Sequence, residues 1–533
     1  MVVFTSDDRA DPSACATPQA VSVYDPESTP VPTRPPSVLT KQSSNEFSVY
    51  FSENDERNPL NFNRAKKWRI TVVAATFTVL VSASATSYSQ GSSSMMKDLN
   101  CTQFQATMGL SLYCLGFGIL PLITSSSSEE FGRQPLYYIS VFGFLLMHLM
   151  TALSPNIQSV LVARFLQGSF GSTGATMVAG TVADIWAPSE RGLPMSMYSL
   201  GAFLGNALGA LMGGWVETNR HLGWRWIQWI HFIIGGVYYV VMLIIIRETR
   251  ASVILNSMAR ELRKSTGDSR YQSAISRNST LAQMMYDSCT RPVKMLCTEP
   301  IVFAVSLWIG IAWGVYFGMI ESIPGVFKAL HGFNQGEVGT VYMTMAVGSF
   351  LGFLTNMYQE KLYQRDFLQR GPQARLHLSC VAGLLFALSM FMFAWSSTPE
   401  VPWAVLVIAL TIYIWAVFTI YLAVFSYLAD CYSTYASSAL SGQSLFRNVM
   451  SFIFPLFTEQ MFHALGFRWA NTVFAFAALA MAPVPLVGPI LLWPQNISEK
   501  LGLERKRQFN RKGIKRGTQF LYIFHTTREA IKE

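Results

Sequence analysis

Three charged residues interrupt long apolar stretches of this 533-residue chain, namely Arg164, Glu321 and Arg447. A charge at the centre of a membrane helix costs on the order of 2.5–3.5 kcal/mol on insertion scales, so a retained charge indicates function. We expect all three to face a polar cavity. The alternative for Arg164 and Glu321 is a place at the lipid headgroups, which a long side chain reaches with its charged end. Gln167 shares the helical face of Arg164, so it either presents a donor to the same point or bonds to another helix.

Charged residues also gather in the short connections between the apolar stretches. Pairing among Glu129, Arg133 and Asp184 would join the ends of neighbouring helices. Such a contact can act as a latch that holds one conformation and breaks in another. The alternative is an ordinary set of solvated loop charges. The candidate gating residues are Glu129, Gly132, Arg133, Asp184, Arg191 and Asp430.

Glycine recurs at every fourth position in the apolar stretch after Arg191. This spacing places the glycines on one helical face, where another helix can approach closely. We expect this face to pack at the interface where two groups of helices rock against each other. The glycine stripe consists of Gly201, Gly205, Gly209 and Gly213, with Gly214 beside it.

The composition indicates that membrane helices position these residues. The chain is 51% hydrophobic and 13% charged, whereas soluble proteins carry about 25% charged residues. A helix that spans a bilayer needs about 20 mostly apolar residues. Such runs predict an all-α membrane protein with twelve transmembrane helices, at 68–90, 104–126, 135–153, 157–184, 193–216, 225–247, 299–323, 335–358, 376–396, 402–430, 438–464 and 469–493.

The two halves of the chain share local features. The fourth predicted helix ends in Val182–Asp184 (VAD), and the tenth ends in Leu428–Asp430 (LAD). Such similarity predicts two pseudo-symmetric six-helix bundles. The expected parts are a disordered cytoplasmic tail (1–67), an N-terminal bundle (68–247), a cytoplasmic linker (248–298), a C-terminal bundle (299–493) and a basic cytoplasmic tail (494–533).

Lysine and arginine concentrate before the first helix, between the halves and in the C-terminal tail. Because cytoplasmic loops are enriched in these residues, we expect both termini to be cytoplasmic. The sequon at Asn100 then lies in an external loop, where it predicts a glycan. We expect a monomer in the plasma membrane, with the vacuolar membrane as the alternative.

Several function classes do not fit the sequence. There is no GxxxxGK[ST] motif, so ATP hydrolysis does not drive this protein. The seven cysteines form no CxxC pair, and we expect no metal and no cofactor. No histidine-rich or paired-carboxylate cluster suited to catalysis lies within the predicted helices, so we do not expect an enzyme. The net charge of +9 comes from residues between apolar runs and in the tail. It therefore does not predict nucleic-acid binding.

The stretch ARFLQGSFGSTGATMVAGTVADIWAPSERG, at residues 163–192, resembles the major facilitator superfamily. More narrowly, it resembles the fungal twelve-span drug:proton antiporters. The family pattern R-x-x-Q-G matches Arg164, Gln167 and Gly168. The resemblance implies that Arg164 takes part in proton coupling.

Two further patterns of this family match with departures. In the loop pattern G-x-L-x-D-x-x-G-R-[KR], the acid is Glu129 and the invariant Gly-Arg pair is Gly132 and Arg133, whereas Ser125 and Gln134 differ. The antiporter pattern G-x-x-x-G-P-x-x-G-G is matched by Gly205, Gly209, Gly213 and Gly214, with Ala210 in place of the proline.

The resemblance implies a secondary active transporter that works by alternating access in a lipid bilayer. The expected activity is proton-coupled efflux of a small organic compound, such as a toxic secondary metabolite or a drug. The alternatives are a polyamine exporter, an uptake facilitator or proton symporter of the same fold, and a membrane receptor without transport. The scarcity of acidic residues deep in the helices disfavours a polycation. The absence of the PESPR motif argues against sugar uptake.

Overall fold

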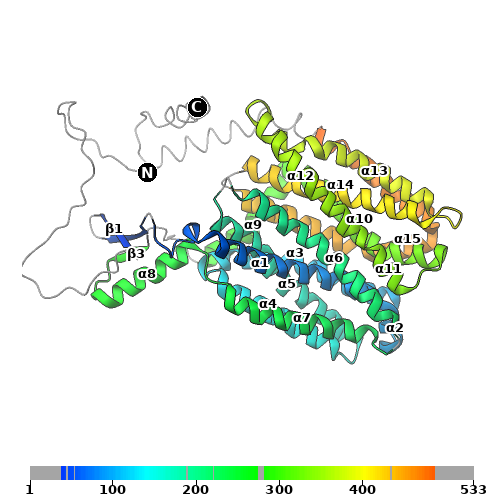
Figure 1. Cartoon of the computed structure of the whole chain (residues 1–533), viewed down its shortest axis with the longest axis horizontal. Helices are drawn as coiled ribbons and strands as arrows, with labels where there is room; N and C mark the ends of the chain where they lie inside the picture. The colour runs from blue at the N-terminus through cyan, green and yellow to red at the C-terminus, as the bar shows by residue number, and fades with distance from the viewer. Residues whose placement is uncertain are drawn as a thin grey trace, which may run out of the picture.

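Long helices in two groups make up most of the protein (Figure 1). The computed structural model describes residues 38–43, 46–52, 54–187, 190–219, 221–273, 281–432 and 435–486. The first group contains α1 (Arg64–Gln90), α2 (Ser92–Leu99), α3 (Gln103–Glu130), α4 (Arg133–Ala152), α5 (Ile157–Ile185), α6 (Gly192–Thr218) and α7 (Gly223–Ile245).

The second group follows a central segment. Its last helix contains a break at Gly466, whose backbone angles (φ 73°, ψ 167°) are not helical. The elements are α10 (Pro300–His331), α11 (Gln335–Val341), α12 (Met343–Arg370), the 3-10 helix η2 (Gly371–Leu376), α13 (His377–Ser396), α14 (Trp403–Tyr432) and α15 (Ala436–Met481).

By length and apolar composition, ten helical segments of the described chain could cross a membrane. α5 is not among the ten because glycine, serine and threonine dilute its apolar residues, and α15 counts once although Gly466 divides it. With α5 included and α15 taken as two helices, the segments correspond to the twelve predicted ranges. The predicted all-α membrane fold is confirmed.

Each group forms its own bundle. Within the first group α1 packs on α6 and α3 on α5, and within the second α10 packs on α15 and α13 on α14. The two bundles meet along two seams, with α3 against α15 and α6 against α11 and α12. In Figure 1 the first bundle lies below the second. The boundary between the bundles is therefore formed by α3, α6, α11, α12 and α15.

A small sheet and two helices lie at one end of the bundles (Figure 1). β1 (Val38–Ser43) pairs antiparallel with β2 (Glu46–Phe51), which pairs in parallel with β3 (Tyr271–Ser273). α8 (Ala251–Thr266) packs on this sheet, and α9 (Leu281–Thr298) packs on α3 and α15. The sheet and α8 share a separate apolar core of Val49, Leu255, Met258, Ala259, Leu262 and Tyr271.

The prediction of disorder over residues 1–67 is therefore wrong for its later part. β1, β2 and the 3-10 helix η1 (Pro59–Asn61) lie there, and α1 already begins at Arg64. Val49 finds its apolar partners on α8, far away in the chain, so no local pattern reveals this core. Residues 1–37 and the predicted basic tail, 494–533, lie outside the described residues.

Candidate functional site

Arg164 is fully buried inside the first bundle, with 0% of its surface exposed. Its Nη1 donates to Oε1 of Gln167 at 2.6 Å and to the carbonyl and hydroxyl oxygens of Ser84, both at 3.3 Å. Its Nε donates to the carbonyl of Gly109 at 3.4 Å. The predicted pairing with Gln167 is thus present, and the alternative position at the headgroups is wrong.

Two tyrosines enclose the same guanidinium group. The centroids of the Tyr88 and Tyr113 rings lie 4.3 and 4.4 Å from its Cζ. The Tyr88 hydroxyl donates to the carbonyl of Ala106 and the Tyr113 hydroxyl to that of Val81, at 3.1 and 2.8 Å. Because these bonds fix both rings, the cation–π contacts hold Arg164 in one place.

A buried histidine pair lies elsewhere in this bundle. His148 of α4 and His231 of α7 stack with their ring centroids 5.0 Å apart. His231 Nε2 lies 2.8 Å from the Ser87 hydroxyl, and His148 Nδ1 lies 2.8 Å from Oε1 of Gln228. We did not predict this cluster, because each histidine stands alone in an apolar run. The only sequence signal was a polar residue at a membrane depth.

Arg447 of α15 is the buried arginine of the second bundle, with 9% of its surface exposed. Its Cζ lies 4.7 Å from the ring centroid of Trp313 and 5.2 Å from that of Tyr421. Within the part of the chain that the structure describes, its side chain makes no ion pair or hydrogen bond, and its Nε is buried without a partner. Aromatic faces are therefore its main contacts.

An aromatic cluster joins the two bundles beside Arg447. The ring of Phe203, on α6, has its centroid 5.4 Å from Trp313, 5.6 Å from Tyr316 and 5.2 Å from Phe418. Trp313 also lies 5.2 Å from Tyr421. Since α6 belongs to the first bundle and α10 and α14 to the second, this cluster fills the space between them.

Glu321 of α10 lies at the boundary between the bundles. Its carboxyl group is beside the hydroxyls of Ser89, on α1, and Thr107, on α3. Within the described residues Glu321 makes no ion pair. It therefore connects the second bundle to the first through neutral partners.

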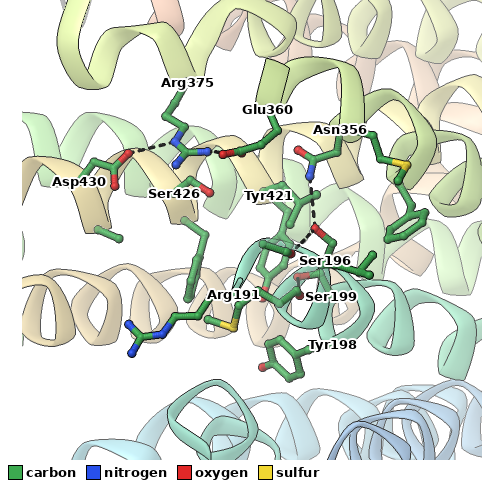
Figure 2. Close-up of a pocket in the computed structure, with 18 of the residues that line it drawn as sticks. Arg191, Ser196, Tyr198, Ser199, Asn356, Glu360, Arg375, Tyr421, Ser426 and Asp430 are labelled. Atoms are coloured by element: carbon green, nitrogen blue, oxygen red, sulfur yellow. Dashed lines mark hydrogen bonds and ion pairs between the residues drawn. The ribbon is translucent and has the colours of Figure 1, made fainter. Parts of the chain in front are cut away.

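A cavity of about 690 Å³ opens between α6 of the first bundle and α12 and α14 of the second (Figure 2). Asn356 and Ser196 face each other across it, with Asn356 Nδ2 donating to the Ser196 hydroxyl at 3.3 Å. The lining includes Glu190, Arg191, Ser196, Tyr198, Ser199, Phe353, Asn356, Glu360, Lys361, Arg375, Tyr421, Phe425, Ser426 and Asp430.

The three charges that were predicted to face a cavity, Arg164, Glu321 and Arg447, lie at different places relative to this one. None of Arg164, Glu321 and Arg447 lines it, so the expectation that all three charges face one cavity is not met here. The reason for Arg164 is physical: acceptors of its own bundle hold its Nε and Nη1, and only Nη2 is buried without a partner among the described residues. Arg447 lies behind Tyr421, whose ring lines the cavity.

The predicted pairing of Arg133 with Asp184, the candidate latch, is present. Arg133 Nε lies 2.6 Å from Oδ2 of Asp184, and Arg250 Nη1 lies 3.4 Å from Oδ1. Glu248 accepts a bond from the backbone amide of Arg133 at 3.1 Å, which satisfies a free donor at the start of α4. Gly132 has φ 93°, and a Cβ there would collide with the Glu248 carboxyl group. We did not select Glu248 and Arg250 from the sequence.

Arg191 and Glu129, two other predicted gating residues, are not part of this ion pair. Arg191 donates to the backbone carbonyls of Trp186, at 2.8 Å, and Ala183, at 2.5 Å. These carbonyls end α5, so Arg191 caps that helix. The side chain of Glu129 lies outside the described residues.

A second latch lies in the second bundle and contains the predicted residue Asp430. Arg375, just before α13, places Nε 3.0 Å from Asp430 Oδ2 and Nη1 2.6 Å from Glu360 Oε2 (Figure 2). The Tyr363 hydroxyl also donates to Asp430 at 2.9 Å. This arrangement parallels the Arg133–Asp184 pair at the start of α4, although we did not select Arg375.

The glycine stripe packs inside the first bundle rather than at the rocking interface. A Cβ atom added at Gly209 would lie 2.6 Å from the Cα of Ala83 on α1, which is too close. One added at Gly201 would lie 3.3 Å from the nearest atom, a methyl of Val79. Gly205 and Gly213 also face α1, so the expected place of the stripe is wrong. Spacing shows which residues share a face, but not which helix they meet.

Gly214 and the departure at Ala210 do lie between the bundles. A Cβ at Gly214 would lie 2.9 Å from the Cα of Gly339 on α11, and one at Gly339 would lie 2.7 Å from the carbonyl of Ala210. Nearby, Gln335 Nε2 donates to Oε1 of Gln90 at 2.8 Å. α11 lies at the opposite end of the molecule from α8 and the sheet (Figure 1). The bundles are therefore in tight contact at this end.

Comparison with known proteins adds independent information. Residues 72–455 match the family described as Major Facilitator Superfamily. The efflux pump FUBT of Fusarium oxysporum is 32% identical over 448 residues, which cover 83% of this chain and 75% of that protein. The major facilitator-type transporter sorT of Penicillium rubens is 32% identical over 450 residues, which cover 83% and 86%.

Solved structures show the same fold. A bacterial homologue of the human lysosomal transporter Spinster, in an inward-facing and unoccupied conformation, matches with a TM-score of 0.58 and 14% identity over 81% of this chain and all of that one. The fold and the relatives confirm the predicted family and a multi-pass membrane transporter rather than an enzyme. With a family match over most of its length, this chain belongs to the Major Facilitator Superfamily.

Proposed function

We propose that this chain is a secondary active exporter, in which a proton gradient drives a small organic compound out of the cytoplasm by alternating access. The observation that carries the proposal is the cavity of about 690 Å³ between the bundles. It lies on the side of the two latches, whereas α6 and α11 close the other end. Its volume is in the range of about 300–1,000 Å³ that is usual for small-molecule sites.

The charge distribution supports the direction of transport. Because lysine and arginine mark the cytoplasmic side, the open end faces the cytoplasm. An exporter loads its substrate in this state. The names of relatives agree, since FUBT and MFS2 of Trichophyton rubrum are called efflux pumps and mdrA of Aspergillus fumigatus a multidrug transporter.

Glu321 is our candidate for the proton-coupling carboxyl group, and Arg164 organises the helices around it. Tyr88 lies near enough to Glu321 and Arg164 to interact electrostatically with both. Glu321 is half-buried, and removing a carboxylate further from water without a cationic partner is costly. Protonation of Glu321 therefore favours closure of the bundles around Ser89 and Thr107, and closure favours protonation. Loss of the proton favours separation of the two bundles at this point. Such a link allows a proton gradient to bias which side is open.

Inside-out vesicles from a pump-deficient yeast test this proposal, with a compound against which expression of the chain protects the cells. We expect an acidic lumen to drive accumulation of that compound and a protonophore to abolish it. Glu321→Gln keeps the shape but cannot release a proton, so it should retain downhill exchange and lose accumulation. Accumulation that requires an alkaline lumen would indicate uptake by symport instead.

We also propose that both termini are cytoplasmic, that the protein is a monomer of the plasma membrane, and that Asn100 carries a glycan. Asn100 is exposed and ends α2, at the end of the molecule far from the latches. A glycan there would add mass that Asn100→Gln removes. An unchanged electrophoretic mobility in that variant would contradict the glycan.

A further inference from the structure

We propose that the substrate is an aromatic organic anion and that Arg447 binds its acid group. This inference rests on the proposed function, in which the cavity between α6, α12 and α14 is the substrate site. It names the chemical class that this cavity selects.

The first observation is the uncompensated charge of Arg447. Its guanidinium group makes no hydrogen bond or ion pair among the described residues, and it lies against the ring faces of Trp313 and Tyr421. A cation–π contact offsets only part of the penalty for burying an ion. A bound anion would supply the missing counter-charge. The planar guanidinium fork suits a carboxylate, which it can bind through two parallel hydrogen bonds.

The second observation is that Arg447, although it does not line the cavity itself, contacts a residue that does. Tyr421 lines the cavity, and its ring centroid lies 5.2 Å from Cζ of Arg447. Tyr198, from the first bundle, lines the same cavity. It lies near enough to Tyr421 and Arg447 to interact electrostatically with both. An acid group that moves past these two tyrosines would reach the guanidinium group.

The third observation is where the carboxylates of the cavity lie. Three carboxylates line it, Glu190, Glu360 and Asp430, and Arg375 binds the last two. Neutral residues also line the cavity, with Ser199, Ser426 and Phe425 among them, and none of its carboxylates pairs with Arg447. A cationic substrate would therefore find no counter-charge beside Arg447, whereas a planar aromatic ring can pack on the tyrosine and phenylalanine faces.

Binding to the purified full-length protein in lipid nanodiscs tests the inference without transport. The probes are naphthoate, the uncharged naphthamide and the cationic naphthylmethylamine, which share one ring system. We expect naphthoate to raise the unfolding temperature and to bind at least about ten-fold more tightly than the other two, a difference of about 1.4 kcal/mol. Arg447→Gln should remove this preference, and Arg447→Lys should keep part of it.

The comparison among the three probes on the wild-type protein remains decisive even if a variant does not fold. Naphthoate binding that is absent, no tighter than naphthamide binding, or unchanged in a folded Arg447→Gln protein would overturn the inference. A protein that binds naphthoate through Arg447 but shows no proton-driven accumulation in vesicles would contradict the proposed function and leave the substrate class standing.

Discussion

Each bundle buries one arginine between two aromatic rings, but the two guanidinium groups are held in different ways. Arg164 donates hydrogen bonds to Gln167, Ser84 and Gly109, all within its own bundle. Arg447 makes none among the described residues, and its contacts are the rings of Trp313 and Tyr421. The same residue type in the same kind of aromatic setting is therefore held in two different ways.

The difference shows how hydrogen bonding assigns a role to a buried charge. A guanidinium group with fixed acceptors orders the helices that supply them, so Arg164 joins α1, α3 and α5. A guanidinium group without acceptors keeps its donors available to a ligand. We infer that Arg164 belongs to the coupling machinery and Arg447 to the substrate site.

The largest effect is expected for substitutions of Arg164, the arginine that is held by hydrogen bonds. Arg164→Ala should reduce proton-driven accumulation in vesicles to about 1% of wild type or less, because loss of several charge-assisted bonds of about 1.5–3 kcal/mol each disorders three helices. Arg164→Lys keeps the charge but not the fork, so it should recover little activity. Immunoblots of the membrane fraction control for protein amount. Normal accumulation, or a loss confined to acidic compounds, would give both arginines the same role.

A smaller effect is expected from the packing that supports Arg164. Gly209→Ala pushes α1 away at Ala83, next to Ser84, and overpacking of this kind costs about 1–3 kcal/mol. Gly201→Ala is the matched control, since its Cβ would lie 3.3 Å from the nearest atom. We expect Gly209→Ala to lower the unfolding temperature and accumulation and Gly201→Ala to change them little. Equal effects would show that the close approach of α1 and α6 does not position Arg164.

The smallest effects concern the two latches. Asp184→Asn leaves Arg133 without a carboxylate among the described residues, whereas Asp430→Asn leaves Arg375 paired with Glu360 at 2.6 Å. We expect Asp184→Asn to shift the balance between inward and outward accessibility by about 1–2 kcal/mol, roughly ten-fold, and Asp430→Asn by less. Thiol labelling of single cysteines on the two sides measures this balance. A larger shift for Asp430→Asn would reverse the order of the two latches.

Local spacing in the sequence predicted much of the fold and part of the site. Apolar runs placed the membrane helices, and the three-residue interval between Arg164 and Gln167 predicted their shared face. The charges of Arg133 and Asp184 predicted their pairing. These features depend on the helix period or on a few possible partners, so one sequence contains enough information.

Contacts between distant segments could not be predicted. Val49 packs on α8, His148 stacks on His231, and the face of Gly209 meets α1 rather than the second bundle. Each contact depends on which helices are neighbours and how they are rotated. Helical periodicity does not determine either property, so these parts of the site required the structure.

The most direct test of the central claim is the accessibility of Ser426→Cys, in the cavity, and Gln90→Cys, in the closed seam, with the native cysteines replaced. A membrane-impermeant maleimide should label Ser426→Cys from the cytoplasmic face only and Gln90→Cys from neither face in the resting protein. Acidification of the external side should not open the cavity to that side until substrate is present. Labelling of Ser426→Cys from the external face at rest, or from neither face, would contradict an inward-open exporter.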